Sequence, residues 1–265
     1  MVAVLRVPEG WAEVGSIGAS IGFLSLPILT LYFGAMIEMR VLSLVGIMGG
    51  GLAGVGVSQF LLRQALSFWL RGCVVGASQV FTVLWAWALG CLVGRLLRDK
   101  NIVLPAAAVL ATADVILVWA PVGPIRQFLS YEAGQRAFEA VAYQVPRFGQ
   151  ALELPLSPVA YVGPADFVFI AMFFGVIHRF GMQGKKTLLW LVPTLAAYLV
   201  VVIGFGDRTV LGISLATMPA LLPIGVVVVL VNRREFDLSA GEKWLTVGVV
   251  LMCVILMVVA FSFAR

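Results

Sequence analysis

Two aspartates inside otherwise apolar stretches are the residues of this sequence best suited to chemistry. Asp114 lies in the apolar stretch 101–120, and Asp166 lies in the stretch 161–175. An ionisable side chain at membrane depth costs about 2.5–3.5 kcal/mol on insertion scales, so its presence there indicates a function. Two carboxyl groups that face each other can share a proton and perform acid/base chemistry. The elements that carry these aspartates therefore matter most.

The composition is that of an integral membrane protein. Hydrophobic residues make up 62% of the chain and charged residues 12%, against about 45–50% and 25% in soluble domains. The apolar runs are about 20 residues long and do not alternate, which favours helices over a barrel. The net charge is +5, with Lys and Arg scattered between the runs as in membrane flanks. We expect a multi-pass protein whose partner is the lipid bilayer (the plasma or inner membrane in a prokaryote), with no nucleic acid.

The apolar pattern predicts an all-α fold, a polytopic bundle of about eight transmembrane helices within one integral membrane domain, 1–265. The expected spans are 15–37, 41–62, 72–94, 101–121, 161–178, 187–206, 209–231 and 244–263. We divide the domain into an N-terminal three-span part (15–100), a core (101–235) and an extra C-terminal span (244–263).

The segment 122–160 is the one connection long enough to hold structure of its own. Its first half, 125–143, mixes polar and apolar residues and predicts a helix lying on the membrane surface. Its second half contains Pro146, Pro155 and Pro158 and is interpreted as an irregular connector.

A glycine cluster marks the second predicted span, at positions 49, 50, 51, 54 and 56. Close helix packing through small residues is the favoured interpretation, and a flexible gating helix is the alternative.

Other intramembrane chemistries lack their residues. The single histidine, His178, stands at a span end, so neither a serine–histidine pair nor an HExxH zinc motif is present. The three cysteines have no CxxC spacing. We expect no metal site and no cofactor, since a mechanism with two carboxylates needs only water.

The two aspartates are expected at matched depth. Asp114 lies about seven residues before Pro121, and Asp166 about five residues after Tyr161. At 1.5 Å per residue these positions are roughly 10 Å and 8 Å from the same membrane face, if the helices are antiparallel neighbours. Two alternatives stay open at this point: an inert polar contact, and ion coupling in a transporter.

Three segments resemble a known family. The first runs from Ala113-Asp114 through Pro121 to Gly123-Pro124-Ile-Arg126, the second is Gly163-Pro-Ala-Asp166-Phe, and the third is Pro219-Ala-Leu221. In this order they are similar to the motifs of the presenilin and signal peptide peptidase class of intramembrane aspartyl proteases, presenilin in particular. The resemblance covers about 105–235.

The resemblance implies a presenilin-like core in which Asp114 and Asp166 are the catalytic pair. It also implies that two segments shape the substrate site, namely Gly163, Pro164 and Ala165, and Pro219, Ala220 and Leu221. The sequence departs from the family at Ala113, where a tyrosine is usual, and at Ala165, where a glycine is usual.

Pro219 is expected about ten residues into the span 209–231, slightly deeper than the aspartates. The three segments would then surround one cavity. The alternative is that Pro219 and Pro223 merely kink a packing helix.

The predicted function is intramembrane proteolysis, in which an aspartate pair and water hydrolyse a peptide bond within a transmembrane-helix substrate. The alternative is a non-proteolytic membrane protein, either a protease relic that binds helices or a small transporter.

Overall fold

The computed structural model describes residues 9–64, 66–120, 123–146, 158–205, 209–210, 213–214 and 219–262, and most of them are helical. The longer helices are α1 (Glu9–Ala35), α2 (Val41–Leu62), α3 (Phe68–Leu96), α4 (Val103–Trp119), α7 (Pro164–Arg179), α8 (Gly184–Phe205), α9 (Leu221–Asn232) and α10 (Ala240–Ser262). The shorter elements are η1 (Lys100–Ile102), α5 (Pro124–Ser130), α6 (Glu132–Val141), β1 (Tyr143–Pro146), β2 (Pro158–Val162), β3 (Thr209–Val210) and β4 (Ile213–Ser214).

The predicted all-α membrane bundle is confirmed in outline. Among the described residues, six helices are long and apolar enough to cross a membrane: α1, α2, α3, α4 together with η1, α8 and α10. The other two apolar helices are shorter, with 16 residues in α7 and 12 in α9. The count of eight spans therefore stays a prediction.

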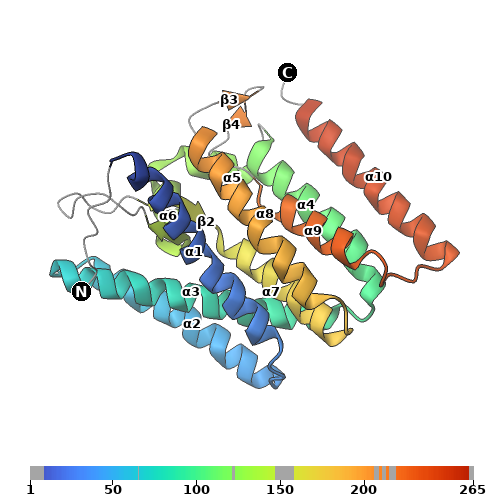
Figure 1. The fold of residues 1–265 in the computed structure, drawn as a ribbon, viewed down its shortest axis with the longest axis horizontal. Helices are drawn as coiled ribbons and strands as arrows, with labels where there is room; N and C mark the ends of the chain where they lie inside the picture. The colour runs from blue at the N-terminus through green and yellow to red at the C-terminus, as the bar shows by residue number, and fades with distance from the viewer. Residues whose placement is uncertain are drawn as a thin grey trace.

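Helix α7 is the central element of the bundle (Figure 1). It packs along α3 and also contacts α1, α8 and α9, while α4 packs chiefly against α9 and α10. Most of its side chains from Phe167 to Ile177 are buried. A helix that is buried on nearly every side has apolar residues on all its faces. This explains the run of large hydrophobic residues in α7.

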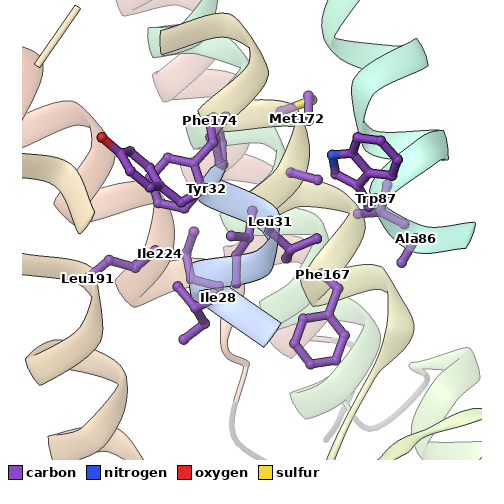
Figure 2. Close-up of a cluster of buried hydrophobic side chains, with 14 of the residues drawn as sticks. Ile28, Leu31, Tyr32, Ala86, Trp87, Phe167, Met172, Phe174, Leu191 and Ile224 are labelled. Carbon is purple, nitrogen blue, oxygen red and sulfur yellow. The ribbon is translucent and has the colours of Figure 1, made fainter. Parts of the chain in front are cut away.

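The core joins α1, α8 and α9 to α7 (Figure 2). Phe167 of α7 and Ile28 of α1 are almost completely buried, as are Leu191 of α8 and Ile224 of α9. Tyr32 of α1 meets Phe174 edge to face, with ring centroids 5.2 Å apart. This packing fixes the depth of α7, and with it the position of Asp166.

Glycines let α3 approach its neighbours closely. A Cβ on Gly90 would lie 2.3 Å from the Val168 carbonyl oxygen of α7, so only glycine fits at this crossing. In α2, a Cβ on Gly51 or Gly54 would lie 2.8 Å or 2.5 Å from α3 side chains. The packing interpretation of the glycine cluster therefore holds for these two. The other three have open space.

The segment after α4 differs from the prediction. The single surface helix expected over 125–143 is two helices, α5 and α6, because Tyr131 between them is extended. The expected irregular connector contains an antiparallel pair, in which Tyr143 lies opposite Val162 and Val145 opposite Ala160. The pair ends at Pro146 and Pro158, as expected for residues that interrupt a ladder. Residues 147–157 lie outside the described residues.

The predicted helix over 209–231 is also wrong in its first half. Thr209 pairs with Ser214 and Val210 with Ile213, so this stretch begins as a short hairpin. The helix α9 begins only at Leu221. Pro219 therefore precedes a helix rather than kinking one, while Pro223 sits in the first turn of α9, where proline is tolerated.

Candidate active site

Asp114 lies near the end of α4 and is partly buried. The helix ends at Trp119, and Ala120 has extended backbone angles. The Gly123 N–H donates to the Ala120 carbonyl at 2.8 Å. A Cβ on Gly123 would lie 2.5 Å from the Leu117 carbonyl oxygen, so the chain can fold back over the end of α4 only with glycine here. α5 therefore contacts α4, the helix that carries Asp114.

Asp166 lies in the first turn of α7. Gly163 is the N-cap and Pro164 the first helical residue, a position at which proline is favoured because its ring presets the backbone. The Asp166 N–H donates to the Gly163 carbonyl at 3.1 Å. A carboxylate at a helix N-terminus is stabilised by the unpaired N–H groups there. The sequence Gly-Pro-Ala-Asp thus opens a helix and positions an acid in its first turn.

The third segment reaches Asp114 through the backbone. Ala220 is the N-cap of α9. The Leu221 N–H donates to the Asp114 carboxylate oxygen Oδ2 at 2.9 Å. Asp114 therefore faces the N-terminal end of one short helix, and Asp166 lies within the N-terminal end of another.

Asp166 and Asp114 are near enough to interact electrostatically. Their helices do not pack extensively on each other. Instead α9 packs against α4 and also touches α7. The two helices are thus linked through α9 and are not the antiparallel neighbours expected from the sequence, and the matched depth stays a prediction.

The remaining residues singled out by sequence flank this pair. Gly163 and Pro164 are partly exposed and precede Asp166 directly, and Ala165 is exposed. Ala165 is helical, so alanine suits a position where the family usually has glycine. Pro219 is buried and Ala220 is partly exposed. The structure brings Leu221 to Asp114. The other five residues lie within three positions of Asp166 or Leu221 in the sequence.

Sequence reasoning missed Tyr198 of α8. Its hydroxyl oxygen is buried and has no hydrogen-bond partner among the described residues. The side chain is within electrostatic range of both Asp166 and Asp114. One signal was available: a tyrosine in an apolar span must place a polar hydroxyl somewhere.

A cavity of about 400 Å³ lies at the opposite end of α7. Its lining includes Tyr32, Phe174, His178, Lys185 and Lys186. His178 lies twelve residues after Asp166, roughly 18 Å along the helix, so this cavity is separate from the carboxyl pair.

Searches with family models and against curated proteins and solved structures find no match to this chain.

Proposed function

We propose that this chain is an intramembrane aspartyl protease, similar to presenilin in its core, that hydrolyses peptide bonds within transmembrane helices. The observation that carries the proposal is the pairing of Asp114 and Asp166, which two separate apolar helices bring within electrostatic range. Placing two carboxyl groups in an apolar bundle costs free energy, which favours a functional role for them. Together they can supply an acid and a base.

The reaction needs one carboxyl group in each protonation state. The ionised aspartate removes a proton from a water molecule, whose oxygen attacks the carbonyl carbon of the scissile bond. The protonated aspartate gives its proton to the carbonyl oxygen as the carbon–oxygen π bond breaks. The first aspartate, now protonated, then gives its proton to the peptide nitrogen while the second takes a proton from one hydroxyl of the tetrahedral intermediate. The carbon–nitrogen bond breaks, which releases an acid and an amine and restores both aspartates. Either aspartate can begin as the acid, since the pair titrates as a unit.

The substrate class follows from where the pair lies. A peptide that reaches Asp114 and Asp166 from the bilayer must be apolar, and a membrane helix meets this condition. Its backbone must unwind locally, because a helical peptide bond is enclosed by its own turns and hydrogen bonds. Membrane-spanning protein helices are thus the proposed partners.

The test is cleavage of a reporter membrane protein by the purified chain in lipid vesicles. Asp114→Asn and Asp166→Asn should each reduce the rate by at least about 10³-fold, because each removes a group that must transfer a proton. Asp237→Asn is the matched control, since its side chain is 82% exposed at the other end of α4, paired with Lys100.

Full activity in either site variant would eliminate the aspartyl-protease proposal. Wild-type protein that captures the reporter helix without cleaving it would indicate a helix-binding protein instead.

A further inference from the structure

The hydroxyl oxygen of Tyr198 is buried and has no hydrogen-bond partner among the described residues. Among the described residues, two buried side-chain polar atoms lack a hydrogen-bond partner: the Trp87 indole nitrogen and the Tyr198 hydroxyl oxygen. The Trp87 ring is pressed against α1, where a Cβ on Gly34 would lie 2.7 Å from the indole nitrogen, so no room remains there for a ligand. The Tyr198 hydroxyl instead lies within electrostatic range of both aspartates.

Tyr198 reaches the site because of how α7 and α8 are connected. The two helices are joined by a short turn between Arg179 and Gly184. Asp166 lies 13 residues before Arg179, and Tyr198 lies 14 residues after Gly184. At 1.5 Å per residue these distances are about 20 Å and 21 Å along two helices that share a turn. The matched register brings Tyr198 to the level of the first turn of α7, while α8 itself packs chiefly against α9 and α1.

Other hydroxyl groups in α8 show why this one is exceptional. Thr187 and Thr194 donate to carbonyl oxygens four residues earlier, at 2.9 Å and 2.7 Å. A tyrosine hydroxyl stands too far from its own backbone to do this, so its partner must come from elsewhere. A buried hydroxyl without a hydrogen-bond partner destabilises the fold. A catalytic or ligand-binding role is one explanation for such a group.

We propose that the Tyr198 hydroxyl is a third catalytic group, which donates a hydrogen bond to the carbonyl oxygen of the scissile peptide bond. This inference rests on the proposed protease function. The phenol keeps its proton throughout: water supplies the attacking oxygen, and the aspartates move the protons. Negative charge grows on the carbonyl oxygen as water attacks, so the hydrogen bond strengthens on the way to the tetrahedral intermediate.

The variant that tests this proposal is Tyr198→Phe, which removes one oxygen atom and keeps the ring. Removal of a single donor of this kind lowers kcat by about 10²–10³-fold in other proteases. We expect a fall of about 100-fold in kcat and in kcat/KM, with KM within about twofold of wild type, because the bond is made chiefly in the transition state. The melting temperature should be equal to or above that of wild type, because the lost hydroxyl has no partner to leave behind.

Tyr32→Phe is the matched control. Tyr32 is also buried, but it packs against Phe174 on the far side of the core. The Tyr32→Phe enzyme should cleave the reporter at the wild-type rate. A Tyr198→Phe enzyme within about threefold of wild type would overturn the proposal, as would a loss of activity accompanied by a lower melting temperature.

A binding measurement separates this inference from the protease proposal. The probe is an apolar peptide with a hydroxyethylene group in place of the scissile bond, whose hydroxyl mimics the tetrahedral oxygen. If both proposals hold, its affinity falls at least tenfold in Asp114→Asn and in Tyr198→Phe. Loss only in the aspartate variant overturns the assignment of Tyr198 and leaves the protease standing. Unchanged affinity in both variants overturns both.

Discussion

The Leu221 backbone N–H donates a hydrogen bond to the Asp114 carboxylate oxygen Oδ2 at 2.9 Å. This bond links two segments that are 107 positions apart in the chain. It places the first N–H of α9, one of the groups that a helix cannot satisfy itself, on the side chain of a candidate catalytic acid. The same contact therefore orients Asp114 and caps α9.

The double use of Asp114 predicts a difference between two inactive variants. Asp114→Asn keeps a side-chain oxygen that can accept from Leu221, whereas Asp114→Ala leaves this N–H without a partner. We expect the asparagine variant to have the higher free energy of unfolding, by about 1 kcal/mol. Unfolding of both proteins in the same detergent measures it. Equal stabilities would show that the bond does not hold α9.

The crossing of α3 and α7 gives a second prediction. Gly90→Ala should lower the free energy of unfolding by about 1–3 kcal/mol, because the new methyl group would lie against the Val168 carbonyl oxygen. Cleavage should fall as well, since α7 carries Asp166. Gly76→Ala is the control: it is in the same helix, and a Cβ there meets nothing within 4 Å. If the two variants behave alike, close packing at Gly90 does not position the site.

The junction that attaches α10 gives a third prediction. The Asn101 amide nitrogen donates to the Asp237 carbonyl at 3.1 Å and to Glu242 Oε1 at 3.3 Å, and its oxygen accepts from the Asp237 N–H at 3.2 Å. Asn101 is buried. Asn101→Ala should therefore cost about 1–3 kcal/mol of unfolding free energy.

Lys100→Ala is the comparison for this junction. It breaks the ion pair with Asp237, in which the aspartate side chain is 82% exposed, and exposed pairs contribute about 0–1 kcal/mol. Proteolysis of the connection between α9 and α10 reports both changes. A larger effect from Lys100 than from Asn101 would contradict the burial argument.

The fourth prediction concerns pH. Cleavage requires one protonated and one ionised aspartate, so acid stops the reaction by protonating both and alkali by ionising both. The rate of reporter cleavage should therefore follow a bell-shaped curve, and kcat/KM over about pH 4–9 measures it. Asp237→Asn should give the same curve. A flat profile would rule out a carboxyl pair that shares one proton.

The sequence singled out Asp114 and Asp166 because ionisable residues are rare in apolar stretches. The structure brings them within electrostatic range, but not on helices that pack directly against each other. The sequence-based prediction was wrong where proline and irregular backbone determine the start of a helix, as at α9. The apolar pattern of 209–231 predicts a helix, but the pairing of Thr209 with Ser214 and of Val210 with Ile213 depends on contacts that periodicity does not contain. Pro219 was therefore placed within a helix rather than in front of one.

Tyr198 was missed for a different reason. Its sequence environment is an ordinary apolar span, and only the packing of α8 within the bundle, chiefly against α9 and α1, gives its hydroxyl a location. In the same way, nothing near Gln79 indicates that its side chain donates to the Gln144 carbonyl at 3.2 Å and so ties α3 to the strand that pairs with β2. Long-range contacts of this kind follow from the tertiary fold and not from local pattern.

The shortness of α7 and α9 has a consequence for the surrounding lipid. With 16 and 12 residues, these helices are about 24 Å and 18 Å long, against a hydrocarbon core of about 30 Å. α7 is enclosed by other helices, whereas Leu222, Val226 and Leu230 of α9 are exposed. The bilayer must therefore become locally thinner where it meets α9, at a cost that rises with the mismatch. Lipids with shorter acyl chains reduce this cost. Bilayer thickness thus acts on α9, whose first N–H donates to Asp114, and it becomes a physical variable that changes the site without any substitution.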